Sequence, residues 1–308
     1  MRLLSLFFAF AFALPAANYY YLVVAGLGGT PDYEKQFELW ASETQHALQA
    51  GGPNVHVETL SGAKATRQEL YETLTKLASQ IQADDTFALL MIGHGTYDGD
   101  NYKFNLPGPD ITAAELAALL DRILATRQLV VNMTSASGAS LPVLARKGRV
   151  VITATKSGNE KNLTVFPRYF LDALRDPEAD TDKSGSLSAL EAFRYTQRKT
   201  GNYFESEKLL ATEHAMLDDT GSKDGTRDPS AANGEGLSAS AFPLIPAGTS
   251  PTVAASPEKQ KLLARKEELE AKIDKLKYQK AAMPEDEYKR QMSQLLLDLA
   301  RTQAEIDR

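Results

Sequence analysis

The segment Gln128–Gly138, which reads Gln-Leu-Val-Val-Asn-Met-Thr-Ser-Ala-Ser-Gly, decides how the chain folds. Its first half, Leu129–Met133, is a largely apolar run typical of a buried parallel strand, and it breaks into small hydroxyl residues and glycine, as in a tight turn. Open α/β sheets carry their chemistry at the carboxyl ends of strands. We therefore expect Thr134, Ser135 and Ser137 to lie where a nucleophile would lie.

Length and composition narrow the class of protein. The chain has 308 residues, more than a single small core needs, so we expect one large domain with an appendage. A formal net charge of −6 argues against a nucleic-acid partner, because such proteins normally present a basic face. The absence of cysteine excludes disulfides, thiolate metal sites and a cysteine nucleophile.

The first 17 residues have the pattern of a secretory signal peptide. Arg2 precedes the apolar run Leu3–Leu14, and the small residues Pro15-Ala16-Ala17 offer a cleavage site. The apolar run is shorter than the roughly 20 residues of a transmembrane helix, although an uncleaved membrane anchor remains the alternative. We expect a mature chain that begins near Asn18, is secreted or periplasmic, and has no stable insertion in the membrane.

Strand and helix patterns alternate over the first half of the mature chain, which predicts an α/β fold with a mainly parallel central sheet and helices on both faces. The glycines of Gly26–Gly29 follow the first strand, but their spacing is not that of a dinucleotide-binding loop. The expected strands are Tyr19–Ala25, Asn54–Leu60, Asp85–Ile92, Leu129–Met133 and Arg149–Thr155; the expected helices are Asp32–Leu48, Ala65–Ile81 and Ala113–Leu124.

His94 is the histidine that this arrangement singles out. It follows a predicted strand end and lies between Gly93 and Gly95, which would expose the imidazole at the carboxyl edge of the sheet. A solvated loop histidine is the simpler interpretation. A second strand end with hydroxyl residues nearby favours a functional role.

These segments together resemble the legumain family, which belongs to the caspase-like group of peptidases. The resemblance runs in order over roughly Tyr19–Asp219 and rests on the His-Gly and Ser-Gly motifs that end two strands. It implies a caspase-like three-layer domain over residues 18–228. It also implies a catalytic dyad of a histidine, here His94, and a cysteine three residues before the glycine of the second motif, a position that Ser135 occupies.

The resemblance further implies where a substrate would lie. Backbone N–H groups at Gly95 and Ser135 would form the oxyanion hole. Residues after the strand that ends at Thr155 would line the groove, and composition alone fits a solvated loop there equally well. The substrate-binding residues expected by analogy are Lys156, Ser157 and Asn159.

Serine in place of cysteine leaves the activity open. A hydroxyl is a weak nucleophile that needs a base in direct contact, whereas a thiolate is already charged when substrate arrives. A Ser135–His94 dyad could hydrolyse peptide bonds if an acid such as Asp98 or Asp100 orients the imidazole. The alternative is an inactive pseudopeptidase that binds a peptide or protein in the same groove.

Residues 180–191 match the calcium-binding loop of an EF-hand position for position. Gly185 occupies the sixth place, where the loop turns sharply, and an extracellular chain would meet calcium at the millimolar level that a weak site needs. The loop is single, so we expect a structural Ca²⁺ rather than a sensor. A helix cap formed by Ser188 and Glu191 is the alternative. The predicted ligands are Asp180, Asp182, Ser184, Ser186, Ser188 and Glu191.

The remainder of the chain divides into a linker and a helical tail. Pro229–Pro257 is rich in Ser, Ala, Gly and Pro and is interpreted mainly as a linker, although Ala241–Ile245 could add a strand. Residues 258–308 carry two near-heptad apolar stripes separated by Met283-Pro284, which predicts a helical hairpin. The stripes could close on each other, self-associate or meet a protein partner, so the tail could also serve assembly.

Overall fold

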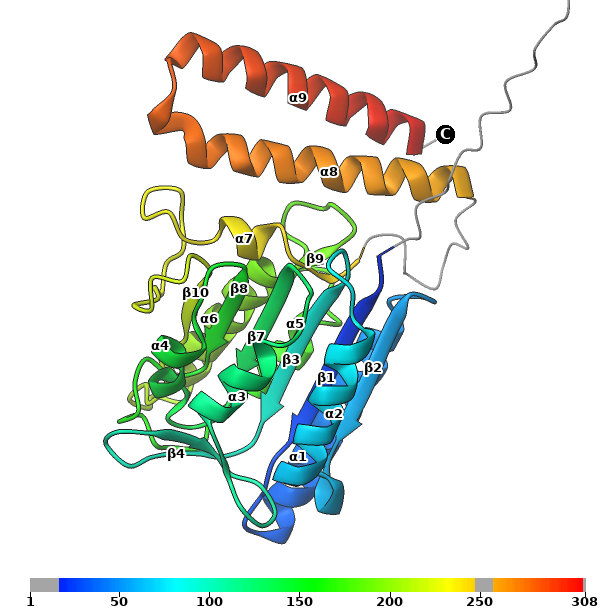
Figure 1. The fold of residues 1–308 in the computed structure, drawn as a ribbon. Helices are drawn as coiled ribbons and strands as arrows, with labels where there is room; N and C mark the ends of the chain where they lie inside the picture. Colours follow the sequence, from blue (N-terminus) through cyan, green and yellow to red (C-terminus); the bar gives the residue numbers. More distant parts are fainter. Residues whose placement is uncertain (1–16, 247–256, 307–308) are drawn as a thin grey trace, which may run out of the picture.

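Six strands form the central sheet of the computed structural model, which describes residues 17–246 and 257–306 (Figure 1). The strand order is β10-β8-β7-β3-β1-β2. Five of these strands, β1, β2, β3, β7 and β8, are parallel, and β10 pairs antiparallel with β8 at one edge. Their bounds are β1 Tyr19–Ala25, β2 Val55–Leu60, β3 Thr86–Ile92, β7 Arg127–Asn132, β8 Arg149–Thr153 and β10 Met216–Asp218.

Helices cover both faces of this sheet because side chains alternate along each strand. Tyr21 and Val23 of β1 face a core with α1, α5 and α6, whereas Leu22 and Val24 face a second core with α2, α3 and α4. The predicted three-layer α/β fold with a mainly parallel sheet is confirmed. The helix bounds are α1 Pro31–Gln49, α2 Arg67–Gln80, α3 Ala113–Leu120, α4 Leu141–Leu144, α5 Phe166–Ala173 and α6 Ala189–Ser206.

The register brings three strand ends to the same edge of the sheet. Met91 of β3 pairs with Asn132 of β7, and Asn132 pairs with Thr153 of β8. The segments that follow these residues therefore leave the sheet side by side. A small antiparallel sheet continues directly from β3 and consists of β4 Gly95–Tyr97, β5 Tyr102–Phe104 and β6 Ile111–Thr112.

The first half of the predicted linker Pro229–Pro257 is structured, and the strand suggested at Ala241–Ile245 is present. Residues Leu237–Ser240 form α7, and β11 Pro243–Ile245 pairs with β9 Leu187–Ser188. Phe242 and Leu244 are buried in the core with α6, so these few apolar residues hold the segment to the domain. Residues 247–256, the remainder of the linker, lie outside the described part of the chain, as do residues 1–16 of the predicted signal peptide.

The tail forms the predicted helical hairpin from α8 Pro257–Gln279 and α9 Glu285–Ile306. Leu269, Ile273 and Leu276 of α8 are buried, and α8 also contacts α7. The hairpin lies at the end of the sheet where the parallel strands begin, opposite the end that carries β4 (Figure 1). Within the described ranges, each helix is too short or too polar to cross a membrane.

Candidate active site

Ser135 lies in a strained turn directly after β7. Ala136, the next residue, has a φ of 55°, a left-handed conformation that costs a residue with a Cβ about 1–2 kcal/mol. Such strain is common at functional sites, where the surrounding structure enforces it. The Ser135 hydroxyl accepts a hydrogen bond from Gly95 N at 3.1 Å and donates one to Gly95 O at 3.0 Å. Both hydrogen-bonding functions of this hydroxyl are therefore used by one backbone residue.

Gly95 reaches Ser135 this closely only because it has no side chain. A Cβ at this position would lie 2.5 Å from the carbonyl oxygen of Ser135 and from the ring of Tyr102. Contacts this short do not occur between real Cβ atoms and backbone. With any side chain at position 95, β4 and the turn at Ser135 could not come this close. The His-Gly motif thus places the backbone of β4 directly against the serine turn.

Buried polar side chains hold the turn from below. The Tyr102 hydroxyl lies 2.6 Å from Thr134 Oγ1, and both approach Asn132 Oδ1. On the other side, Ser137 Oγ accepts from Thr155 N, and the Thr155 hydroxyl accepts from Gly138 N. Because each buried polar group has a partner, the network fixes the turn in one conformation.

His94 is half-buried against aromatic residues of α1. Its ring lies 5.7 Å from that of Tyr33 and 5.3 Å from that of Phe37, edge-on to both. Burial lowers the pKa of His94, and a hydrogen bond with the backbone of Gly28 partly opposes this effect. The imidazole is therefore neutral at neutral pH, the state that a general base requires.

The structure places His94 and Ser135 at the same edge without joining their side chains. Ser135 contacts Gly95, the residue after His94, but no hydrogen bond among the described residues links Ser135 to His94. The same backbone contact uses the N–H of Gly95, one of the two predicted oxyanion donors.

Asp98, one of the two acids suggested as orienting groups for His94, is engaged elsewhere. The Asp98 carboxylate accepts from the backbone of Asp100 and Asn101 and pairs with Lys103 at 3.0 Å. These bonds lower the pKa of Asp98 to about 2, with the Asn101 N–H as the largest cause. Asp98 therefore closes the turn between β4 and β5 and does not bond to His94, and the suggested triad is wrong for this acid.

The predicted substrate-binding loop, residues 156–162, adjoins the serine turn. A Cβ on Gly138 would lie 2.2 Å from Lys156 C and Ser157 N, and one on Gly158 would lie 2.2 Å from the Tyr97 ring. The loop therefore packs against both the turn and β4. The side chains of Lys156 and Asn159 remain exposed.

Sequence reasoning missed a cluster of titratable residues that includes Glu160 of this loop. Glu160 bonds to His214, and Glu213 lies beside them with its carboxylate accepting from Val165 N and Phe166 N at the start of α5. Burial raises the pKa of Glu213 to about 7. Glu160 and His214 are 54 residues apart, so the only sequence signal was the acid–histidine dipeptide at 213–214.

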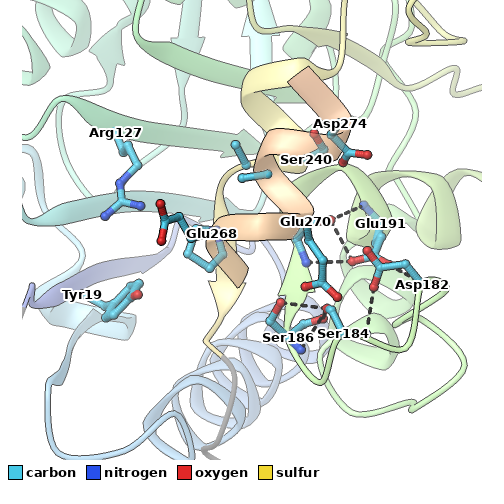
Figure 2. Close-up of a pocket in the computed structure, with 14 residues that line it drawn as sticks. Tyr19, Arg127, Asp182, Ser184, Ser186, Glu191, Ser240, Glu268, Glu270 and Asp274 are labelled. Carbon is cyan, nitrogen blue, oxygen red and sulfur yellow. Dashed lines mark hydrogen bonds between the residues drawn. The ribbon is translucent and has the colours of Figure 1, made fainter. Parts of the chain in front are cut away.

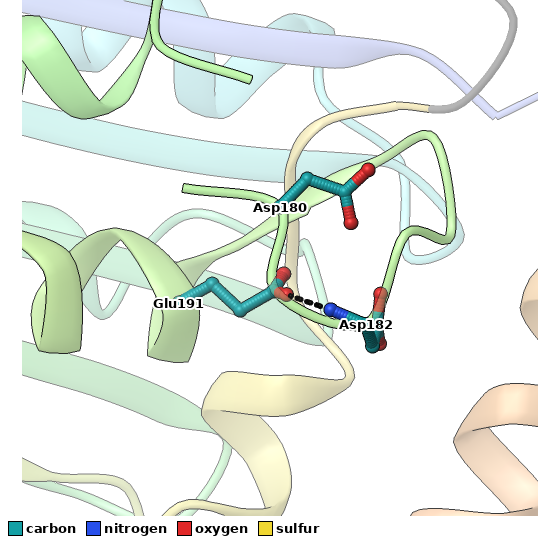
Figure 3. A group of neighbouring side chains, drawn as sticks. All are labelled: Asp180, Asp182 and Glu191. Carbon is teal, nitrogen blue, oxygen red and sulfur yellow. Dashed lines mark hydrogen bonds between the residues drawn. The ribbon is translucent and has the colours of Figure 1, made fainter. Parts of the chain in front are cut away.

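The predicted calcium loop brings its three carboxylates together. Asp180, Asp182 and Glu191 each offer an oxygen within 4.8 Å of the others (Figure 3). Burial raises the pKa of Asp180, and the neighbouring carboxylates Asp182 and Glu191 add to this effect. The helix cap is also formed, since Ser188 Oγ accepts from Glu191 N and donates to Glu191 Oε2. Both oxygens of Glu191 accept hydrogen bonds, because Oε1 accepts from Thr181 N and Asp182 N and Oε2 accepts from Ser188 N.

A pocket of about 320 Å³ separates this loop from α8 (Figure 2). Glu268, Glu270 and Asp274 line it from the helix, opposite Asp182 and Glu191. Lys266 of α8 donates to Lys183 O in the loop at 3.2 Å. The predicted ligands Ser184, Ser186 and Ser188 also line the pocket.

No protein-family model and no curated protein sequence matches the chain. The structure is similar to that of protein GSU0716 from Geobacter sulfurreducens, with a TM-score of 0.45 and 15% identity, over 66% of this chain and 93% of that one. It is also similar to the Drosophila initiator caspase Dronc, with a TM-score of 0.46 and 12% identity, over 66% of this chain and 80% of that one.

Proposed function

We propose that this chain is a catalytically inactive pseudopeptidase, related to legumain within the caspase-like group, that binds a peptide or protein segment at the carboxyl edge of its sheet. The ligand would lie along the edge formed by the serine turn, β4 and residues 156–162. The serine turn and the loop lie against each other there, and exposed polar side chains of Lys156 and Asn159 border it.

The observation that carries this proposal is the engagement of the Ser135 hydroxyl by the Gly95 backbone. Attack on a carbonyl requires the hydroxyl to rotate away and to give its proton to a base. Rotation breaks two hydrogen bonds of about 1 kcal/mol each, which reduces the population of a competent serine roughly thirty-fold. Among the described residues no carboxylate bonds to His94, which instead has a hydrogen bond with the backbone of Gly28.

Hydrolysis by a Ser135–His94 dyad is the second candidate function. It is favoured by the lowered pKa of His94. An incoming substrate could supply the interactions that release the hydroxyl, since catalytic contacts often tighten only in the substrate complex.

A serine-directed fluorophosphonate separates the two candidates. The mature protein is incubated with the reagent in the presence of calcium, and its intact mass is measured beside those of Ser135→Ala and His94→Ala. We expect no adduct on a protein shown by circular dichroism to be folded. A single adduct that both variants lose would establish the hydrolase instead.

Peptide binding is tested directly by selection. A phage-displayed library of random dodecapeptides is panned on the folded protein, and the Kd of the recovered peptide is measured for the wild type and for Asn159→Arg. We expect a bulky cation at this exposed rim position to weaken binding, with Glu205→Arg on the outside of α6 as the control. If the recovered peptide has the same Kd for all three proteins, it binds elsewhere on the chain, which contradicts the proposed site.

We further propose that residues 180–191 hold a structural Ca²⁺. Three convergent carboxylates at EF-hand spacing support this proposal. Calcium is expected to raise the melting temperature of the wild type and not that of Asp180→Asn. The predicted signal peptide supports a secreted or periplasmic location, which N-terminal sequencing of the expressed protein would test.

The tail supports a proposal of assembly. Leu296 and Leu297 of α9 are 49% and 47% exposed, so part of the apolar surface of the hairpin is not covered by α8. Self-association or a protein partner would bury it. The mass in solution, measured by light scattering before and after Leu296→Asp, distinguishes a self-associating chain from a monomer.

A further inference from the structure

Glu160 connects the predicted substrate-binding loop, residues 156–162, to the serine turn. Its carbonyl oxygen accepts from Ala136 N at 2.8 Å, the amide of the strained residue that follows Ser135. Its carboxylate accepts from Lys156 N at 2.8 Å, at the start of the loop. One residue therefore holds both segments that the proposed ligand would contact.

His214 in turn holds Glu160. The Glu160 carboxylate accepts from His214 N at 3.1 Å and lies 2.5 Å from His214 Nδ1. The two side chains are only 11% and 23% exposed, so water competes weakly for this bond. His214 precedes β10, the edge strand of the sheet, and is therefore anchored to the domain independently of the loop.

We propose that Glu160 and His214 are positioning residues whose mutual hydrogen bond sets the conformation of residues 156–162 and of the serine turn, so that ligand binding at this edge depends on the pair. The proposal rests on the proposed function and adds the residues that position its binding site. It assigns a role to two residues that the motifs of the resemblance do not include.

The surroundings of the pair show how it holds the loop. The Glu160 carboxylate accepts from the backbone N–H groups of both Lys156 and His214, and Lys156 Nζ lies 3.9 Å from Glu160 Oε1. Glu213 lies beside the pair, and its charge and that of Glu160 repel. Loss of the His214 ring or of the Glu160 carboxylate would therefore release the start of residues 156–162 from the segment before β10.

Amide hydrogen exchange of the unliganded protein tests the pair without any ligand. Exchange of residues 156–162 is expected to be roughly three- to ten-fold faster in His214→Leu and Glu160→Leu than in the wild type. His214→Gln keeps a hydrogen-bond donor, so it should exchange as the wild type does. Glu205→Gln, an exposed residue of α6, should do so as well.

The Kd of the phage-selected dodecapeptide connects the pair to binding. We expect the wild type, His214→Gln and Glu205→Gln to bind alike, and His214→Leu and Glu160→Leu to bind several-fold more weakly. An unchanged Kd in His214→Leu and Glu160→Leu overturns the proposal. If no peptide is recovered, the proposed function fails, and hydrogen exchange still decides whether the pair controls the loop.

Discussion

Glu213 provides a prediction of stability against pH that can be worked out from its surroundings. The carboxyl group is buried, and burial raises its pKa from 4.5 to about 7 in spite of two N–H donors at the start of α5. A raised carboxyl pKa means that the folded state binds the proton more tightly than the unfolded state does. The free energy of unfolding therefore falls as the pH rises from about 4.5 to about 7, and it stays low above that.

The size of the effect follows from the two pKa values. A difference between 4.5 and about 7 corresponds to about 3 kcal/mol at 1.36 kcal/mol per pH unit. Glu213→Gln keeps the shape and one acceptor oxygen but removes the buried charge. We therefore expect the free energy of unfolding of the variant to exceed that of the wild type by up to about 3 kcal/mol near pH 8.5. Near pH 5 the two free energies should be equal.

Urea unfolding followed by the fluorescence of Trp40 gives this comparison at several pH values between these limits. Glu205→Gln is the matched control, because its side chain is exposed and its stability curve should parallel that of the wild type. Parallel curves for Glu213→Gln and the wild type would falsify the reasoning, since they would show that Glu213 titrates alike in the folded and unfolded states.

Three further predictions concern the backbone and caps, and differential scanning calorimetry checks each of them. Gly95→Ala should destabilise the protein by about 2–3 kcal/mol, because its Cβ would overlap Ser135 O, whereas Gly201→Ala in α6, with open space around it, should stabilise by up to about 1 kcal/mol. Equal effects at these two glycines would contradict the close approach at Gly95. Ala136→Gly should stabilise by about 1 kcal/mol by relieving the left-handed strain; a loss of stability would show that the turn is not strained. Ser188→Ala should cost about 1 kcal/mol through loss of the α6 cap, and a neutral result would mean that the cap does not form in solution.

The arrangement of strands could be predicted because it depends on local patterns. Each buried strand is a short apolar run, and the connection rules for parallel sheets then place His94 and Ser135 at one edge. The direction of the Ser135 hydroxyl could not be predicted in the same way. It depends on how closely the backbone of Gly95 approaches, and residues 95 and 135 come together only in the folded sheet.

The remaining differences also involve contacts between distant parts of the chain. The segment assigned to a linker has the composition of one, but Phe242 and Leu244 are enough to bury it against α6. The pair of Glu160 and His214 joins a loop to the segment before β10, a strand too short to be recognised from its pattern. In the predicted calcium loop the same Ser188 and Glu191 satisfied two sequence patterns, and the structure shows the cap formed, with both oxygens of Glu191 accepting hydrogen bonds.

The position of the α8–α9 hairpin has a consequence for how a partner and a peptide could bind to this chain together. The strands of the sheet separate the hairpin from the edge that carries Ser135, a span of about 23 Å for the seven residues of β1. A partner held by the hairpin would therefore not obstruct the entry of a peptide at the far edge. Both could be bound at once, and the rigid sheet between them would fix their separation and relative orientation.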